Sequence, residues 1–276
     1  LKFKEKDMAK QIDPKYAADD LPKVKNPFLY AYRTIAKLLV YLLFGIGTLI
    51  IVILVFPILR LVWHDKDVFR VKGRIFISSV FNVLIHFMSI IQVSKFKVSD
   101  LKALRNLKSC IIVANHPSLL DVIYTFAFVK NADCIIRAGL KNTIVSGIVK
   151  PLYISNDDDF DKMVADCKKS LDSGSNLIIF PEGTRTPRHG TNPYKKGAAR
   201  IALATGCNIQ PLHIGGSDKY GLGKHDPFYK VHPTETYFYD FTVLPQIAMD
   251  KYKDMQPAVA AKHLTDDMRK VIDSVK

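Results

Sequence analysis

The chain has 276 residues, 48% of them hydrophobic, and a formal net charge of +14 at pH 7. This length and composition are those of a globular protein with one sizeable core and room for an appended segment. The charge predicts an anionic partner, which could be anionic lipid headgroups, substrate phosphates or an acidic carrier protein. Basic residues are spread along the whole chain without a recognised binding module, so we expect no nucleic-acid partner.

The N-terminal part of the chain divides into a charged tail and an apolar segment. Residues 1–37 are charged and contain three prolines, which predicts a surface tail. Residues 38–59 carry no charge, and a helix of this length reaches about 33 Å, close to the roughly 30 Å thickness of the hydrocarbon core. Because basic residues flank both ends equally, we expect both ends on one cytoplasmic face rather than a single span.

A second uncharged stretch follows at residues 75–94. Its polar residues fall within an arc of roughly 140° on a helical wheel, which predicts an amphipathic helix suited to the membrane interface. A core helix of the soluble domain would show the same pattern, so periodicity leaves both interpretations open. Residues 38–94 are therefore predicted to form a membrane-associated helix pair.

Short apolar runs alternate with amphipathic stretches after residue 94. Residues 95–276 are thus predicted to form an α/β domain whose largely parallel sheet is flanked by helices. Strands are expected at residues 110–114, 134–136, 152–154, 177–180, 209–214 and 237–243, and helices at residues 118–129, 160–173, 198–205 and 258–275.

The first motif, Asn-His-Pro-Ser-Leu-Leu-Asp, follows the first of these strands. His116 and Asp121 stand five positions apart, a spacing that allows a general base and its orienting partner. Ser118 and Asp121 also fit a capping box, and spacing alone leaves the two roles of Asp121 level. No third ligand stands near His116 and the four cysteines form no Cys-x-x-Cys pair, so we expect no metal site.

The second motif, Phe-Pro-Glu-Gly-Thr-Arg-Thr, occupies residues 180–186 and also follows a predicted strand. Ligands bind at the carboxyl ends of parallel strands, so the two motifs are expected to share one crevice. Arg185 offers a planar fork for a phosphate or carboxylate, or it pairs with a nearby acid. Glu182 could bind an acceptor hydroxyl or form an ion pair with Arg185.

In this order and at about this separation, the two motifs resemble the glycerolipid acyltransferase family, which includes bacterial lysophosphatidate acyltransferases. The resemblance spans residues 116–214, and it favours the catalytic role for Asp121. It implies an acyltransferase domain on a membrane-seated helix pair, with no bound cofactor. The acyl donor would be acyl-CoA or acyl-carrier protein, and the acceptor a lysolipid hydroxyl. The substrate-binding residues it implies are Glu182, Gly183, Thr184, Arg185 and Lys195.

One block departs from the family pattern. Where the family usually has an arginine that helps hold the glycerol phosphate, this chain has Asn156 followed by acidic residues 157–159. Carboxylates there would repel a phosphomonoester, and Arg137 or Lys141 could compensate.

The sequence therefore predicts an O-acyltransferase of phospholipid biosynthesis on the cytoplasmic face of a membrane, such as a bacterial inner membrane. The expected acceptor is 1-acylglycerol-3-phosphate. The alternatives are a different lysolipid or an unusual acyl group, a hydrolase that uses the same histidine and aspartate, and a lipid-binding protein without activity.

Overall fold

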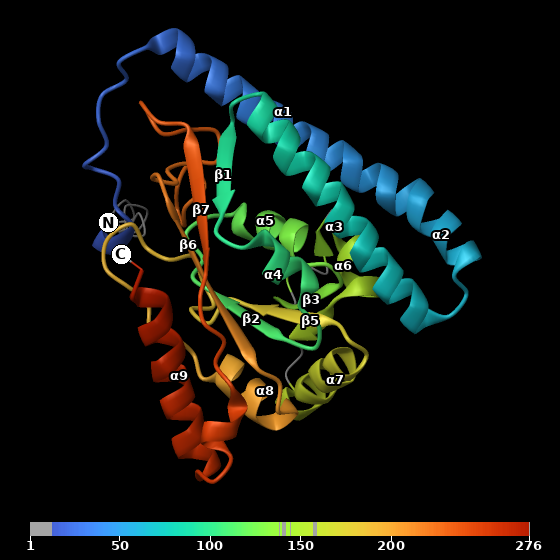
Figure 1. Ribbon diagram of the computed structural model, residues 1–276. Coiled ribbons are helices and arrows are strands. Elements are labelled where there is room, and N and C mark those ends of the chain that lie inside the picture. Colours follow the sequence, from blue (N-terminus) through green and yellow to red (C-terminus); the bar gives the residue numbers. More distant parts are fainter. Residues whose placement is uncertain (1–12, 138, 140–141, 144, 157–158, 276) are drawn as a thin grey trace, which may run out of the picture.

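The computed structural model describes residues 13–137, 139, 142–143, 145–156 and 159–275 (Figure 1). Its strands are β1 (Ser94–Val98), β2 (Ile111–Ala114), β3 (Ala132–Arg137), β4 (Ile154–Asn156), β5 (Asn176–Ile179), β6 (Ile209–Gly216) and β7 (Tyr237–Val243). They form one sheet in the order β1-β7-β6-β2-β5-β3-β4. Neighbouring strands run parallel except β6 and β7, which run antiparallel. The predicted α/β fold with a largely parallel sheet is confirmed.

Strand β2, which leads into the first motif, lies in the middle of the sheet, and all four of its residues are buried. A continuous apolar run is typical of a strand that is covered on both faces. Because side chains alternate between the two faces, Ile112 joins one core cluster while Ile111 and Val113 join the other. The first motif therefore starts from a strand fixed on both sides.

Helices cover both faces of this sheet. The helices of the α/β domain are α4 (Leu101–Asn106), α5 (Asp121–Phe128), α6 (Ser146–Leu152), α7 (Phe160–Asp172), α8 (Gly197–Thr205) and α9 (Pro257–Asp273), and 3-10 turns lie at Pro14–Tyr16 and Met249–Tyr252. Apolar side chains of α7, α8 and α9 belong to one core cluster, and those of α5 belong to the other. In α9, Ala260, Leu264 and Met268 recur every four residues and are buried, as expected of a helix with one apolar stripe.

A long N-terminal helix runs along the outside of the domain (Figure 1). It consists of α1 (Pro27–Ile50), a π-helical stretch (Ile51–Val55) and α2 (Phe56–Val62). Its 36 residues extend about 54 Å at 1.5 Å per residue. By length and composition alone, this helix and α3 (Lys66–Ile90) could each cross a membrane. Large apolar side chains exposed along it include Phe28, Ile35, Leu42, Ile53 and Leu61.

The first helix begins at Pro27, inside the predicted tail of residues 1–37, rather than at residue 38. The Asn26 side chain caps it by accepting a hydrogen bond from the N–H of Leu29 at 3.0 Å. Arg33 and Lys37 are buried against the α/β domain. The prediction followed the uncharged run and therefore covered only part of the helix. The two cations lie within the helix and bind carbonyl groups of the domain.

Four other predicted boundaries were wrong. Helix α3 begins at Lys66 rather than at residue 75, after Asp65 caps its first turn. It ends at Ile90, so Ser94 belongs to β1, a strand that the sequence reading missed together with α4 and α6. Leu152 ends α6 and does not start β4. The helix expected at residues 118–129 begins at Asp121.

Helix α3 combines two environments. Ile77, Ile85 and Met88 are buried, and the helix packs against α5 and β1. Ile75, Val83 and Ile90 are exposed. Of the predicted polar arc, Ser79 and His86 are exposed but Ser78 is buried. One side of α3 is thus a core helix of the domain, while other positions present apolar groups outward.

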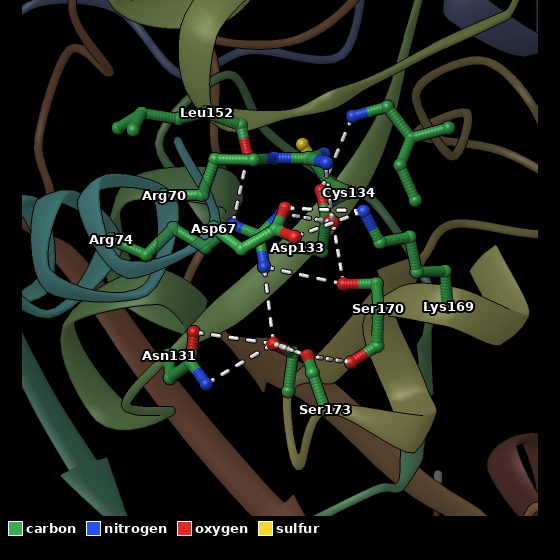
Figure 2. A network of polar contacts seen from close by, with 12 residues as sticks. Asp67, Arg70, Arg74, Asn131, Asp133, Cys134, Leu152, Lys169, Ser170 and Ser173 are labelled. Atoms are coloured by element: carbon green, nitrogen blue, oxygen red, sulfur yellow. Dashed lines mark hydrogen bonds and ion pairs between the residues drawn. The ribbon is translucent and has the colours of Figure 1, made fainter. Parts of the chain in front are cut away.

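A buried polar network ties α3 to the sheet (Figure 2). Arg74 of α3 is bonded through Nη2 to Asp133 of β3, and its Nε donates to the carbonyl of Leu152 at 2.8 Å. Ser170 and Ser175 accept from Nη1 at 3.2 and 3.1 Å. The second carboxylate oxygen of Asp133 accepts the backbone N–H groups of residues 134 and 154. The network therefore fixes the start of β3 and β4 to the N-terminal helix pair.

Candidate active site

His116, in the loop after β2, meets Asp121, the first residue of α5. His116 Nδ1 lies 2.9 Å from Asp121 Oδ2. The carboxylate is fully buried, while the imidazole side chain keeps 17% of its surface exposed. The imidazole also stacks on Phe180 of the second motif, with ring centroids 4.3 Å apart. A proton on Nδ1 donates to the carboxylate in this arrangement, which leaves Nε2 to accept a proton from another molecule.

Asp121 also binds the backbone of its own loop. Its Oδ2 accepts the N–H of Ser118 at 2.7 Å, and its Oδ1 accepts the Ser118 hydroxyl at 2.5 Å. The two roles weighed for Asp121 are therefore not exclusive, because a carboxylate offers about four lone-pair sites. Ser118 is not the N-cap, since α5 begins at Asp121 with Leu120 in the cap position. A negative charge in the first turn is also favoured by the helix dipole.

Glu182 holds the second motif against the first. It is 4% exposed and accepts hydrogen bonds from Asn192 Nδ2 at 2.8 Å, from the Thr186 hydroxyl and from the N–H of His116 at 3.4 Å. Burial raises the pKa of its carboxyl group. Two further bonds join the same loops. The N–H of Thr186 donates to the carbonyl of His116 at 2.7 Å, and the N–H of His116 donates to the Thr186 hydroxyl at 2.8 Å. Glu182 thus holds the loop that carries His116, a contact that was not predicted from the sequence.

Gly183 and Lys195 are neighbours in the structure. Gly183 has φ +64°, a left-handed conformation that glycine adopts without strain. A Cβ at this position would lie 2.8 Å from Lys195 Nζ. Lys195 is exposed and Thr184 is half-buried. Three of the predicted substrate-binding residues therefore lie in the turn of the second motif or against it.

Arg185 reaches toward the segment between β6 and β7. Its Nη1 donates to the carbonyls of Leu222 and Gly223 at 2.9 and 2.8 Å. Desolvation lowers the pKa of this guanidinium group. Neither carbonyl was expected as a partner from the sequence. A guanidinium has five N–H donors, and these two bonds use only those of Nη1.

A cleft of about 340 Å³ opens beside the loop that contains His116 and Pro117. This is within the range of small-molecule sites. Its walls come from five segments of the chain and contain Tyr16 and Asp20, Pro117, residues 186–189, residues 214–219, and Gly223, Lys224 and Asp226. Lys219 is one wall residue whose ammonium group is buried and donates to the carbonyl of Phe238 at 2.9 Å. Burial lowers the pKa of Lys219 to about 8.

Tyr16, Arg188, Asn192 and Lys219 belong to this region but were not singled out from the sequence. Only Arg188 has a local signal in the sequence, because it stands three positions after Arg185 of the second motif. The other three depend on contacts between distant parts of the chain. Tyr16 in particular lies in what reads as a surface tail.

The block that departs from the family pattern lies at the carboxyl end of the outer strands. Arg137 and Asn156 end β3 and β4 and pair with each other in the strand register. The carboxylate of Asp159 caps α7, where it accepts the N–H groups of Asp161 and Lys162. Lys141, like Asp157 and Asp158, lies outside the described residues. Among the residues that the structure does describe, no group of three or more His, Cys, Asp or Glu could hold a metal.

Comparisons with known proteins show which proteins this chain is similar to. Residues 95–215 match the family model described as Acyltransferase. A chloroplastic 1-acyl-sn-glycerol-3-phosphate acyltransferase of Brassica napus, BAT2, is 30% identical over 47% of this chain and 40% of that protein. The 1-acyl-sn-glycerol-3-phosphate acyltransferase of Helicobacter pylori is 33% identical over 48% of this chain and 61% of that protein. The chain thus spans about two fifths to three fifths of these relatives' lengths.

A solved structure shares the fold. The crystal structure of the 1-acyl-sn-glycerophosphate (LPA) acyltransferase PlsC from Thermotoga maritima superposes with a TM-score of 0.67, covering 88% of this chain and 95% of that one at 19% sequence identity. The match extends well beyond the residues of the family model, so it includes elements outside residues 95–215. The resemblance indicated by the two motifs is confirmed, since residues 95–215, which contain both of them, match the Acyltransferase family model.

Proposed function

We propose that this protein is a membrane-bound O-acyltransferase. It transfers a fatty acyl group from an acyl thioester to the free hydroxyl of 1-acylglycerol-3-phosphate, a step of phospholipid biosynthesis. The observation that carries the proposal is the pair of His116 and buried Asp121 at a strand end beside a cleft, in a domain of the acyltransferase family. Acyl-CoA or acyl-carrier protein serves as the donor substrate.

The chemistry needs one base. His116 Nε2 accepts the proton of the acceptor hydroxyl while its oxygen forms a bond to the thioester carbonyl carbon. Asp121 stabilises the imidazolium that results and keeps the ring in position. The tetrahedral intermediate then breaks its C–S bond, and the departing sulfur takes the proton from His116. The products are the acylated lipid and the free thiol.

Charged groups beside the base suit an anionic acceptor. Arg185 lies in the same loop as Glu182, which contacts the backbone of His116. Arg188, His189 and Lys224 line the cleft, together with acidic residues that pair with some of them. A guanidinium fork is well suited to a phosphate. We therefore assign the headgroup of the acceptor to this cleft.

The N-terminal helices seat the protein on the membrane. A helix of 36 residues exceeds the roughly 20 residues that cross a bilayer. Arg33 and Lys37 bind carbonyl groups of Pro233 and Gly221, which holds the helix along the domain. Its exposed apolar side chains then face lipid, while the net charge of +14 attracts the protein to an anionic surface. We place the domain on the cytoplasmic face, where basic residues near the membrane are favoured.

Acyl transfer by purified protein in anionic vesicles tests this proposal. Acyl-CoA or acyl-carrier protein is supplied with 1-acylglycerol-3-phosphate, and products are identified by mass spectrometry. We expect phosphatidate to form, and His116→Ala to lower its rate by about 10²- to 10⁴-fold without changing the thermal unfolding temperature. Full activity of His116→Ala would exclude the assigned base. Thioester loss without any acceptor would show a hydrolase, and transfer only to other lysolipids would show a different acceptor.

A further inference from the structure

The N-terminal segment of residues 13–20 lies far from the helix that follows it. Followed back from the start of α1, the chain runs down one side of the domain. Residues 13–20 lie beside the loop of residues 182–192 and the carboxyl end of α9 (Figure 1). Tyr16 is only 6% exposed, although the residues around it are largely exposed or half-buried. The segment is outside the part of the chain that matches the family model.

Tyr16 anchors this segment to the second motif. Its hydroxyl donates to Asn192 Oδ1 at 3.2 Å and lies 3.3 Å from the carbonyl oxygen of Arg185. The Tyr16 ring meets His225 edge-on at 5.5 Å and lies beneath the ammonium group of Lys224 at 4.7 Å. One side chain thus touches both the second-motif loop and the opposite wall of the cleft.

Residues on either side of Tyr16 add contacts to the same loop. The carbonyl of Lys15 accepts the N–H of His189 at 3.0 Å. Asp20 forms an ion pair with Arg188 at 3.2 Å. Tyr16 and Asp20 both line the cleft. The segment is therefore part of the cleft wall.

A chain of hydrogen bonds leads from Tyr16 toward the base. Asn192, which accepts from Tyr16, donates through Nδ2 to Glu182 at 2.8 Å. Glu182 and Thr186 in turn accept the backbone N–H of His116. Asn192 also donates to the carbonyl of Arg185 at 3.1 Å. The Arg185 carbonyl thus lies within hydrogen-bond distance of the Asn192 amide and of the Tyr16 hydroxyl. Tyr16 also holds Asn192 in place.

We propose that Tyr16 is a positioning residue for the acyl acceptor. It holds the loop of residues 182–192 in place, so that Arg185 and Arg188 present their guanidinium groups to the anionic headgroup. This inference rests on the proposed acyl transfer. His116 keeps its bonds to Thr186 and Asp121, which do not involve Tyr16. Loss of the Tyr16 hydroxyl therefore weakens acceptor binding and leaves the proton transfer intact.

Steady-state kinetics of Tyr16→Phe test the inference, with Tyr229→Phe as the control. Tyr229 is exposed and its ring contacts Phe228. We expect the acceptor KM of Tyr16→Phe to rise by up to about tenfold, because acceptor binding must then order the loop without a hydrogen bond of typical strength. The donor KM and kcat stay within about twofold of the parent chain. The control keeps all three parameters. The thermal unfolding temperature of both variants stays close to that of the parent chain.

An unchanged acceptor KM in Tyr16→Phe overturns the inference. So does a parallel loss of kcat, donor KM and unfolding temperature, which would mean a purely structural role. Hydrogen exchange of the amides in residues 182–192 provides a readout that needs no activity, and we expect faster exchange in Tyr16→Phe only. If the parent chain transfers no acyl group to any lysolipid, the proposed function fails, and unchanged exchange in that loop then rejects the positioning role as well.

Discussion

Two buried aspartates in this molecule are each bonded to a basic side chain and to a serine, yet we propose different roles for them. Asp121 lies past the carboxyl end of β2 and binds His116 and Ser118. Asp133 lies near the start of β3 and binds Arg74 and Ser170. Both carboxylates are fully buried. The types of group are nearly the same in the two clusters.

The partners differ in access and in acidity. The His116 side chain is 17% exposed next to a cleft, whereas the Arg74 side chain is 2% exposed. An imidazole exchanges a proton near neutral pH, and a guanidinium does not. Burial alone therefore does not mark a functional carboxylate. In the proposed mechanism, the functional carboxylate is the one whose partner is an imidazole beside a cleft.

Substitution of Asp121 by Asn should separate the two clusters most strongly. The amide cannot stabilise the imidazolium, so we expect acyl transfer to fall by about 10²- to 10⁴-fold. Asp133→Asn is the matched control, and its folded fraction should keep its acceptor and donor KM values. Initial rates in vesicles, normalised to folded protein, give the comparison. Comparable loss of rate per folded molecule in both variants would contradict it.

The buried pair of the second cluster should show its effect in stability. Arg74→Ala leaves the Asp133 carboxylate buried without its cation, which costs about 3–5 kcal/mol of unfolding free energy. Arg70→Ala is the control, because Arg70 is 30% exposed and 3.8 Å from the same carboxylate, and such a pair contributes about 0–1 kcal/mol. Denaturant unfolding in detergent measures both. Equal stability of the two variants would mean that Arg74 is not the main partner of Asp133.

Much of the fold follows from local patterns in the chain. Residues 111–114 and 177–179 form apolar runs that two-sided burial explains, and the amphipathic stretch at residues 160–173 matches α7 closely. Because parallel strands end at one edge of a sheet, the position of each motif after a strand predicts that the two motifs lie together, and His116 and Glu182 are in contact. The roles of these residues in acyl transfer stay predictions.

What the sequence did not predict depends on contacts between remote segments. Tyr16 contacts Asn192 across most of the chain, and no local pattern marks it. For Glu182 the sequence suggests an acceptor hydroxyl or Arg185 as partner, whereas the fold buries it and bonds it to Asn192, which is ten residues away. Arg33 and Lys37 lie within an apolar helix and are accommodated by carbonyls of a loop about two hundred residues later.

Lys219 gives the smallest expected effect in this comparison of buried charged groups. It lies in the cleft wall, yet its side chain is buried. Its pKa is lowered to about 8 by burial, so the unfolded chain holds this proton more tightly than the folded one. The stability of the parent chain relative to Lys219→Met should therefore rise as the pH increases from about 8 toward 10.4, by about 1–3 kcal/mol. Below pH 8 the difference should be constant. Unfolding of both chains across this range, measured in the same detergent, cancels the titration of other groups. A difference that falls or stays flat above pH 8 would show that Lys219 keeps its proton in the folded protein, and that its bonds to the carbonyls of Gly215 and Phe238 outweigh the cost of burial.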